Sequence, residues 1–379
     1  MDQLAVIRPP AQAIPRPSTP NLRGLDIDEL RTWVATAVGG PSYRTQQLWA
    51  WIHHRRVLEF AAMTNLGRVD RKRLEQRGSL STLNVAQVER AQDDTRKLRL
   101  RTHDGHAIES VLIPNDERGY TLCISSQVGC ALTCSFCATA TLPFARHLAA
   151  WEIVDQVYRA VALLEETTAD PSPKRQITNL VYMGMGEPLL NFQEVQRSIA
   201  ILTHPDGLGI AGRRITVSTA GVLPAIERFG REGLGERVGL AVSLNASTDA
   251  VRDEIMPINR QWPMAELLAC VGALPENRRR DLTFEYVLLA EVNDTPADAQ
   301  RLGRQLRSLR CHVNIIPFNP HPASRYRRPP ARRISAFVTQ LRAAGVSAYL
   351  RTPRGDDIGA ACGQLALQEP TLLASNAPQ

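Results

Sequence analysis

The stretch Gly129-Cys130-Ala131-Leu132-Thr133-Cys134-Ser135-Phe136-Cys137 decides the fold, because its three cysteines have the spacing C-x3-C-x2-C. It comes directly after a predicted strand, so we expect the three thiols to lie on one loop. Three thiolates this close together can hold three irons of a [4Fe–4S] cube and leave the fourth iron open to another ligand. The spacing therefore predicts an iron–sulfur centre with Cys130, Cys134 and Cys137 as ligands.

A structural zinc site is the main alternative interpretation of these cysteines. Structural zinc takes four protein ligands, usually in paired spacings. His147, ten residues beyond Cys137, is the nearby candidate for the fourth position. The cysteines could also be simple core residues, but buried structural cysteines are rarely crowded in this way. The iron–sulfur interpretation is preferred, and the aromatic Phe136 directly before Cys137 supports it.

Short apolar segments alternate with helix-like segments from Tyr120 onward. Such alternation predicts parallel βαβ units, and hence an α/β barrel or an open parallel sheet. The expected strands are 120–125, 178–183, 214–218, 238–244, 282–289, 311–316 and 346–350. Expected helices include 151–166, 191–202 and 331–344. The resulting α/β domain should span 119–366, with a loose tail at 367–379.

Three smaller segments precede this domain. Residues 1–24 are rich in proline without apolar periodicity, which predicts a disordered extension. Residues 25–92 are expected to form a small helical accessory domain that binds RNA, because apolar residues recur at three- and four-residue spacing up to about Gln87. Its apolar positions include Leu48, Trp51, Ile52 and Leu58. Residues 93–118 predict a β-hairpin with a primed turn at Asp104-Gly105.

The bulk composition fits a cytoplasmic globular protein. Hydrophobic residues make up 44% and charged residues 22% of the 379 residues, and the net charge of +7 suits a polyanionic partner. No stretch approaches the roughly 20 apolar residues of a membrane helix, and the N-terminus lacks the pattern of a signal peptide. Seven cysteines, an odd number, argue against a disulfide framework. Nothing in the chain demands more than a monomer.

Glycine and polar residues follow several of the predicted strands. Gly186 and Glu187 come after strand 178–183, where a glycine lets the backbone approach a ligand and a carboxylate can accept from an amino group. Further candidates for cofactor binding follow later strands: Ser218, Ser243, Leu244, Asn245 and Asn319. Each alone is more often a helix cap, but α/β barrels build their sites at the carboxyl ends of strands. The set therefore predicts a cofactor-binding rim beside the cysteine loop.

The sequence also carries motifs far from the cysteines. They are Ser125–Cys130, Met183–Leu190, Ile215–Gly221, Met256–Arg260, Phe284–Val287, Ile316–Pro320, Arg354–Ile358 and Ala361–Leu365. In this order they resemble the RlmN/Cfr family of radical S-adenosylmethionine (SAM) adenine methyltransferases. The resemblance runs from about Tyr43 to Leu365. It implies a partial (β/α)6 radical SAM barrel with an N-terminal helical domain and a β-hairpin extension.

The resemblance also implies the reaction. SAM would chelate the open iron, and an electron from a donor such as flavodoxin or ferredoxin would cleave it to a 5′-deoxyadenosyl radical. The expected product is 2-methyladenine in 23S ribosomal RNA, with transfer RNA as a second candidate substrate. Methylation at C8 of the same adenine is the alternative within the family. Outside this chemistry, the chain could be a radical SAM enzyme with a divergent non-RNA substrate, or a non-enzymatic RNA-binding protein with a structural metal.

The resemblance gives further residues roles. Cys362 would be methylated by one SAM, and a second SAM would generate the radical that activates the methyl group. Cys123 would then resolve the RNA adduct through a transient disulfide, and Glu109 matches the proposed proton acceptor. Cys270 and Cys311 match no role and are expected in the core.

The chain departs from the family pattern after the cluster cysteines. The run Ala138 to Leu148 lacks two usual glycines, and His147 replaces an asparagine. Asn245 stands where histidine is common. Two basic runs, Arg325 to Arg333 and Arg278 to Arg280, are expected to contact phosphates, although a solvated face is the simpler interpretation of such runs.

Overall fold

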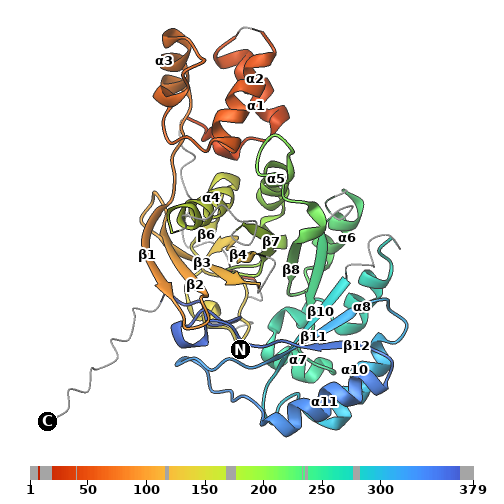
Figure 1. Cartoon of the computed structure of the whole chain (residues 1–379). Helices are drawn as coiled ribbons and strands as arrows, with labels where there is room; N and C mark the ends of the chain where they lie inside the picture. Colours follow the sequence, from red (N-terminus) through yellow and green to blue (C-terminus); the bar gives the residue numbers. More distant parts are fainter. Residues whose placement is uncertain are drawn as a thin grey trace, which may run out of the picture.

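A ten-stranded mixed sheet organises the protein, in the order β1-β2-β3-β4-β7-β8-β9-β10-β11-β12 (Figure 1). This computed structural model describes residues 7–8, 19–39, 41–115, 119–167, 176–232, 234, 238–275 and 282–367. The predicted disorder at 1–6 and 9–18, the tail from 368 onward and the basic run Arg278 to Arg280 lie outside the described residues.

The part of the sheet from β4 to β12 is parallel throughout. Its strands are β4 (Tyr120–Cys123), β7 (Ile177–Tyr182), β8 (Ile215–Thr219), β9 (Gly239–Ser243), β10 (Leu282–Leu288), β11 (His312–Pro317) and β12 (Ser347–Leu350). These seven strands confirm the predicted ones. They form the expected partial barrel, whose open side lies beyond the edge strand β12.

Helices cover the outside of the parallel strands (Figure 1). They are α4 (Ala150–Glu166), α5 (Phe192–Thr203), α6 (Leu223–Arg231), α7 (Asp249–Ile255), α8 (Met264–Gly272), α10 (Pro296–Leu306) and α11 (Ala331–Ala343). α10 shows how the sequence sets a boundary: Thr295 accepts from the Asp298 backbone and Pro296 fills the first turn.

Strand β10 shows how the barrel separates its two faces. Tyr286 packs outward against Phe337 of α11, with ring centroids 5.3 Å apart. Because successive side chains on a strand point to opposite faces, Glu285 and Val287 point into the barrel. Glu285 pairs in register with Ser243 of β9 and Asn314 of β11, so these three side chains share one interior row.

The N-terminal helices stand as a separate group at one end of the barrel (Figure 1). They are η1 (Leu22–Gly24), α1 (Ile27–Ala37), α2 (Tyr43–Trp49), the π-helix η2 (Ala50–His54), η3 (Phe60–Ala62) and α3 (Arg68–Arg77). Two buried polar contacts join them to α4. Arg23 Nη1 lies 3.1 Å from Asp155 Oδ1, and His53 Nδ1 lies 2.7 Å from the Tyr158 hydroxyl.

Order begins earlier than the sequence predicted. Leu22 is fully buried, and Asn21 forms a bridge with Ser79. The backbone N–H of Arg8 donates to the carbonyl of Ala131, in the cysteine loop. The disordered extension predicted to end at residue 24 is therefore wrong for these residues, because long-range partners hold them in place of local periodicity.

The extension that precedes β4 has three antiparallel strands, β1 (Asn84–Arg90), β2 (Arg96–Arg101) and β3 (Ala107–Pro114). The helical pattern expected up to Gln87 and the helical domain expected up to residue 92 are therefore wrong at that end. β1 is an exposed edge strand, and its pairing with β2 overrides the helix-like spacing. Leu58 is 60% exposed and does not belong to the helical core.

The predicted primed turn is also wrong. Thr102 pairs with His106 across the turn, and only Gly105 has a positive φ, of +84°. A three-residue loop with one left-handed glycine is the next commonest hairpin connection. Asp104 is thereby free to accept from Arg146 Nε at 2.7 Å.

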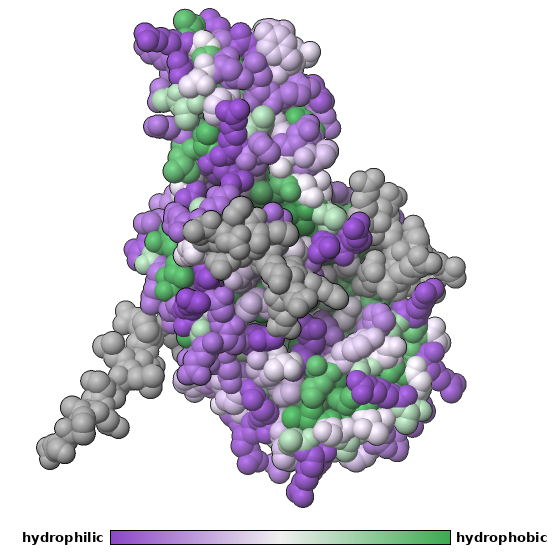
Figure 2. All heavy atoms as spheres, viewed as in Figure 1, coloured by the Kyte–Doolittle hydropathy of each residue, from purple (hydrophilic) through white to green (hydrophobic). Residues whose placement is uncertain are grey.

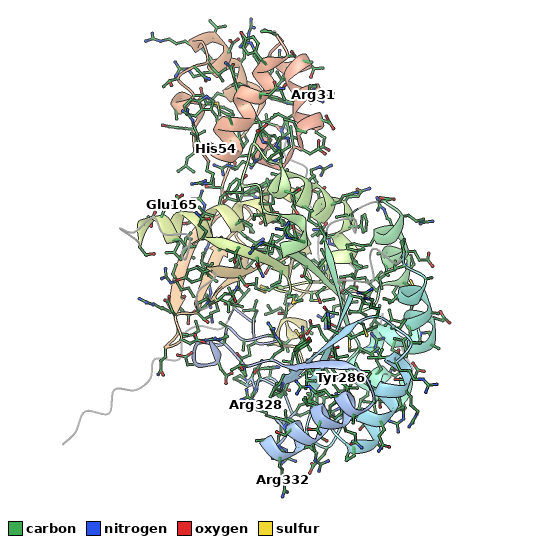
Figure 3. The ribbon with its side chains drawn as sticks, turned by 45° about the vertical axis from the view of Figure 1, so that its right-hand side comes forward. Arg31, His54, Glu165, Tyr286, Arg328 and Arg332 are labelled. Atoms are coloured by element: carbon green, nitrogen blue, oxygen red, sulfur yellow. The ribbon has the colours of Figure 1, made fainter. Side chains whose placement is uncertain are left out.

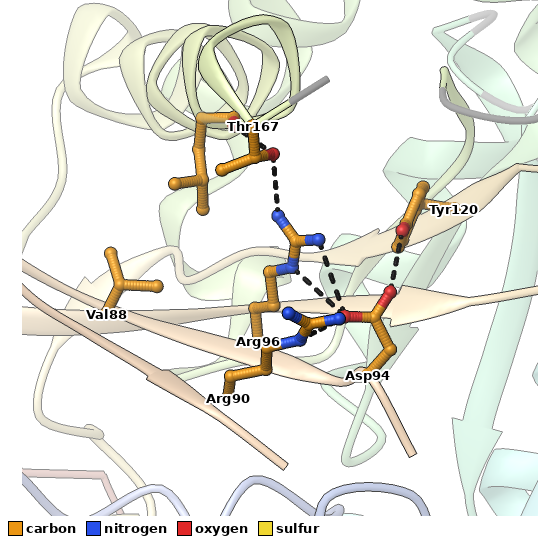
Figure 4. Close-up of a pocket in the computed structure, with 7 residues that line it drawn as sticks. Val88, Arg90, Asp94, Arg96, Tyr120 and Thr167 are labelled. Atoms are coloured by element: carbon orange, nitrogen blue, oxygen red, sulfur yellow. Dashed lines mark hydrogen bonds and ion pairs between the residues drawn. The ribbon is translucent and has the colours of Figure 1, made fainter. Parts of the chain in front are cut away.

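A pocket of about 370 Å³ lies at the opposite end of the barrel from the cysteine loop, where β4 begins and α4 ends (Figure 4). Inside it Asp94 Oδ1 accepts from Arg90 Nε at 2.7 Å, and Arg96 Nη1 donates to the Thr167 hydroxyl at 3.0 Å (Figure 4). In barrel enzymes residues at this end serve stability.

Among the described residues, no helix is long and apolar enough to cross a membrane.

Candidate active site

The cysteine loop is fixed by its backbone at both ends. Gly129 has φ +75°, and a Cβ there would lie 2.1 Å from the Pro143 carbonyl oxygen, so only glycine fits. The Ser135 N–H donates to the Ile255 carbonyl at 3.0 Å, and the Ala138 N–H donates to the Gly363 carbonyl at 2.8 Å. The loop is thus held between the end of α7 and the C-terminal segment.

Cys130, Cys134 and Cys137 all lie on this loop at the carboxyl ends of the strands, each half-buried. Burial raises the pKa of Cys130 to about 12, and the charge of Cys137 adds to this shift. Burial also raises the pKa of Cys134, with contributions from both other cysteines. The three thiols thus share one loop, and their charges act on Cys130 and Cys134.

Arg252 of α7 is a buried cation beside this loop that the motifs of the sequence did not reveal. It is fully buried and donates to the carbonyls of Ala220 at 2.7 Å, Ser243 at 3.0 Å and Leu244 at 3.0 Å. Burial lowers the pKa of Arg252 to about 10, and the charge of Cys134 opposes that shift. Its signal in the sequence was a charged residue four positions before the Met256–Arg260 motif.

Gly186 and Glu187 form a tight turn after β7. A Cβ on Gly186, whose φ is +102°, would lie 2.5 Å from the Gln127 Cβ. Glu187 is 3% exposed, and its two carboxylate oxygens accept from the backbone N–H groups of Leu189 at 3.0 Å and Ala220 at 2.7 Å. Burial raises the pKa of Glu187 to about 7. The structure thus brings Glu187 to the rim, with a carboxylate that titrates near neutral pH.

The remaining rim residues fall into two kinds. Ser218 and Ser243 are half-buried on adjacent strands, and register places them on the interior face. Leu244 and Asn245 continue β9, and their N–H groups point at the Glu285 carbonyl at 3.0 and 3.4 Å.

The side chain of Asn245 is taken up by the fold. It accepts from the Val287 N–H at 2.8 Å and donates to the Met256 sulfur at 3.2 Å. Asn245 has φ +57°, a left-handed conformation that asparagine tolerates well. The Asn245 carbonyl also accepts from Asn293 Nδ2 at 2.7 Å, so any contact of this residue with a ligand would use the second lone pair of that carbonyl or the weakly bonded N–H.

A C-terminal segment, residues 361–367, lies across the cysteine loop. The Thr139 hydroxyl donates to the Leu365 carbonyl at 2.7 Å, and the Asn319 amide donates to the Cys362 carbonyl at 3.1 Å. Arg328 in turn donates to Asn319 Oδ1 at 2.9 Å. Asn319 therefore positions the segment that carries Cys362, in addition to lying on the rim as predicted.

Cys123 and Cys362 lie near enough in the site for the charge of Cys362 to act on Cys123. Cys362 is exposed, whereas Cys123 is buried at the end of β4. Burial raises the pKa of Cys123 above its usual value, and the charge of Cys362 raises it further. Partial removal of the Cys362 sulfur from water raises the pKa of this thiol, and the negative charge of Glu285 is the second cause.

Glu109 of β3 lies on the same face of the sheet as Cys123. Cys123 pairs with Val111, two residues along from Glu109, so all three side chains point the same way. Glu109 is 1% exposed, its Oε2 accepts from the Leu367 N–H at 3.3 Å, and its Oε1 lies 3.7 Å from Arg99. Burial raises the pKa of Glu109. Glu109 and Cys123 thus line one wall of the site.

Comparison with known proteins identifies the family. Residues 20–80 match the model described as the ribosomal RNA large subunit methyltransferase N-terminal domain, and residues 124–302 match the radical SAM superfamily. A dual-specificity RNA methyltransferase RlmN of Desulfotalea psychrophila is 44% identical over 353 residues, which cover 93% of this chain and 96% of that protein. The chain belongs to the RlmN family of radical SAM methyltransferases.

Further RlmN proteins are similarly close. That of Rhodospirillum rubrum is 47% identical over 92% of this chain and 81% of its own length. A radical SAM methyltransferase structure from Sphaerobacter thermophilus is 43% identical, with a TM-score of 0.84 over 91% of this chain and 98% of that one. The radical SAM fold expected from the sequence is thereby confirmed.

As a member of this family, the chain uses a [4Fe–4S] cluster and SAM. The residues present fit the cluster, because three soft thiolate donors share one loop and the buried guanidinium of Arg252 faces the charge they carry. The zinc interpretation needed His147, whose Nδ1 instead lies 3.1 Å from Gln127 Nε2. The described residues contain no group of three or more His, Cys, Asp or Glu that could hold a metal ion, and the family match, not this absence, decides for the cluster.

The basic run after β11 is largely paired with protein groups. Arg325 lies 2.6 Å from Glu254, Arg327 lies 2.8 Å from Glu291, and Arg333 lies 3.7 Å from Asp294. Arg332 projects outward at the edge of the molecule (Figure 3). Exposed pairs of this kind contribute little free energy, so the exposed Arg325 and Arg327 could still exchange their partners for phosphates.

Proposed function

We propose that the chain methylates C2 of an adenine in RNA, with large-subunit ribosomal RNA and transfer RNA as substrates. The observation that carries the proposal is the pair Cys123 and Cys362, two free thiols beyond the cluster ligands that lie near enough for the charge of Cys362 to raise the pKa of Cys123. The printed names of the relatives, dual-specificity RNA methyltransferases, support it.

The need for two extra thiols follows from the target atom. C2 of adenine is electron-poor, so it does not attack the methyl group of SAM directly. When bound, the cluster and SAM supply a methyl group and a radical that activates it. The protein's own contribution is then a sulfur that carries the methyl group and a second sulfur that releases the product.

In this proposal Cys362 carries the methyl group and Cys123 releases the product. Bonding of the methylene carbon to C2 leaves the base attached to Cys362 through sulfur, and the odd electron that this addition leaves on the base would pass to the cluster. Glu109 takes the proton that C2 loses, and its burial suits this role because a raised pKa makes a carboxylate a better proton acceptor. Cys123 then attacks the Cys362 sulfur as a thiolate and a disulfide forms. The bond from that sulfur to the methylene carbon breaks, and the carbon keeps the electron pair and takes up a proton to become the methyl group of the released base.

We further propose roles for the rim residues and the cluster loop. Cys130, Cys134 and Cys137 hold the cluster. Gly186, Glu187, Ser218, Ser243, Leu244, Asn245 and Asn319 hold SAM, Asn245 through its backbone. The half-buried serines on the interior face leave polar groups at the strand ends for such a ligand.

We also propose that the N-terminal helices bind RNA. Their surface is predominantly hydrophilic (Figure 2), and Arg55 stacks 4.1 Å above the ring of Trp51. Such a stacked guanidinium can contact both phosphate and base. We propose that the protein acts as a monomer in the cytoplasm. Flavodoxin or ferredoxin is the proposed electron donor. A reducing compartment suits the seven cysteines, all of which are free.

The test is nucleoside mass spectrometry of unmodified RNA after incubation with the reconstituted protein, SAM and a reductant. Wild-type protein should form 2-methyladenosine, and Cys362→Ala should abolish it. Cys270→Ala is the matched control and should leave product formation unchanged, because Cys270 lies on the outer helix α8. Formation of 8-methyladenosine would instead assign C8, and product from Cys362→Ala would overturn the proposed thiol chemistry.

A further inference from the structure

Glu285 is a buried carboxylate that the proposed reaction does not yet use. It is 8% exposed in the middle of β10, whose other buried side chains are apolar or aromatic. Burying a carboxylate costs several kcal/mol unless partners compensate. Here Asn314 donates to Oε1 at 2.9 Å, and no described contact engages the second oxygen. A buried carboxylate that costs this much free energy indicates a functional role for Glu285, such as proton transfer.

The interior row places Glu285 directly beside the proposed SAM site. Register pairs it with Ser243 on one side and Asn314 on the other, and Asn314 pairs with Tyr349. In-register residues of parallel neighbours point to the same face of the sheet. Glu285 therefore projects into the barrel one strand away from a proposed SAM ligand.

The Cys362 segment lies over the same strands. Asn319, two residues beyond the end of β11, holds the Cys362 carbonyl at 3.1 Å, and Gln364 donates to the Pro320 carbonyl at 2.9 Å. These contacts bring Cys362 above the ends of β10 and β11. Among the charged groups that act on Cys362, Glu285 has the largest effect, which is consistent with its place in the interior row below this segment.

We propose that Glu285 is the proton acceptor for methylation of Cys362, the loading step that precedes any contact with RNA. As the Cys362 sulfur bonds to the methyl carbon, the sulfonium C–S bond of SAM breaks and S-adenosylhomocysteine leaves. The thiol proton passes to the Glu285 carboxylate. A carboxylate, a sulfonium and a thiol thus become a carboxylic acid and two thioethers, and the step leaves no net charge inside the barrel.

This role is distinct from that of Glu109. Glu109 lies on β3, and four strands of the sheet separate β3 from β10. Glu109 contacts Arg99 and Leu367 beside Cys123, whereas Glu285 contacts Asn314 below Cys362. The two carboxylates serve two different proton transfers. The inference rests on the proposed function, because it assumes that Cys362 carries the methyl group.

The first experiment measures loading without RNA or reductant. Reconstituted protein whose Cys362 is shown by mass spectrometry to be a free thiol is mixed with SAM bearing a labelled methyl group, and label on the Cys362 peptide is followed with time. Glu285→Gln keeps the shape and an oxygen that accepts from Asn314, so it should fold. Its loading rate should fall by about 10²- to 10⁴-fold, the usual contribution of a general base.

Two further variants sharpen this comparison. Glu285→Asp, which keeps a carboxylate on a shorter side chain, should recover part of the rate. The exposed Glu254→Gln is the control and should load like wild type, since Glu254 pairs only with the surface residue Arg325. Loading by Glu285→Gln at the wild-type rate or faster would overturn the inference while leaving the proposed function intact. Failure of wild-type protein to load Cys362 would instead overturn the proposed function, and this inference with it.

The second experiment needs neither cluster nor SAM. Alkylation of Cys362 by iodoacetamide is measured against pH in protein without cofactors. Glu285→Gln removes the negative charge that acts on the thiol, while Arg351, Cys137 and Cys123, the other charged or titratable groups near Cys362, are unchanged. The alkylation profile should therefore move to lower pH, although loading from SAM becomes slower. An unmoved profile would show that Glu285 does not face Cys362 and would overturn the inference.

Discussion

Replacing Arg252 with methionine should destabilise the barrel and empty the cluster site together. Methionine has a similar length and suits a buried position, but it donates no hydrogen bonds. Three backbone carbonyls, those of Ala220, Ser243 and Leu244, would lose their donor, as would the side chain of Asn259, whose Oδ1 lies 3.0 Å from Nη1. These groups join the ends of β8 and β9 to the helix that supports the cysteine loop.

The magnitude follows from what is left behind. A buried acceptor without a partner costs about 1–3 kcal/mol, and four are affected here, although some relax or admit water. The gain from no longer burying a charge offsets part of that sum. We expect a net loss of about 3–5 kcal/mol, a large share of the roughly 5–15 kcal/mol by which domains are stable. Arg252→Lys keeps the charge and some of the bonds, so its loss should be about half as large.

Urea denaturation of the protein without its cluster measures this loss directly. The barrel transition of Arg252→Met should move down by about 1–2 M urea. The exposed Arg260→Met is the matched control and should lie within about 0.5 kcal/mol of wild type. Iron bound after reconstitution should fall in Arg252→Met and be intermediate in Arg252→Lys. A stability of Arg252→Met equal to that of Arg260→Met would refute the reasoning.

Three further predictions concern pH and backbone conformation. Burial lowers the pKa of His53 to about 3, so below pH 6.5 the unfolded chain binds a proton at this histidine that the folded protein does not bind. The free energy of unfolding should therefore fall by about 2 kcal/mol between pH 7 and pH 5, and by less in His53→Gln. Urea unfolding measured across this pH range checks the prediction. Exposed His54→Gln is the control and should keep the full pH dependence. Burial raises the pKa of Glu187 to about 7, so SAM, whose amino group favours the carboxylate, should bind up to tenfold more weakly for each pH unit below 7 in calorimetric titrations; affinity independent of pH would contradict the proposed contact. Gly129→Ala should lose most of its iron, because a Cβ would lie 2.1 Å from the Pro143 carbonyl oxygen, and normal iron content would show that the loop can move aside.

The cysteine loop and the parallel strands could be predicted because their sequence signals are short and continuous. The cysteine spacing needs only eight residues, and the strands from Tyr120 onward are short apolar segments between helices, so both could be read without tertiary information. The family motifs extended this to Cys362 and Cys123, which no local pattern connects.

What the sequence could not supply depends on long-range pairing. β1 forms because β2 lies beside it, Arg8 is ordered by carbonyls of the cysteine loop, and Asn245 is occupied by Val287 and Met256. Arg252 looked like an ordinary helix residue, since its four partners come from three separate segments. Apolar periodicity reports on residues that are close in the sequence, whereas these contacts join residues that are far apart in it.

The C-terminal segment, residues 361–367, is made long after the cysteine loop that it covers. The Thr139 hydroxyl and the Leu365 carbonyl that it binds are 226 residues apart in the chain. At about 5–20 residues per second, a ribosome needs roughly 10–45 s to make the intervening stretch. Throughout that interval the cysteine loop exists without its cover. The three thiols are therefore made, and can meet iron, before Cys362 exists and before residues 361–367 cover the loop.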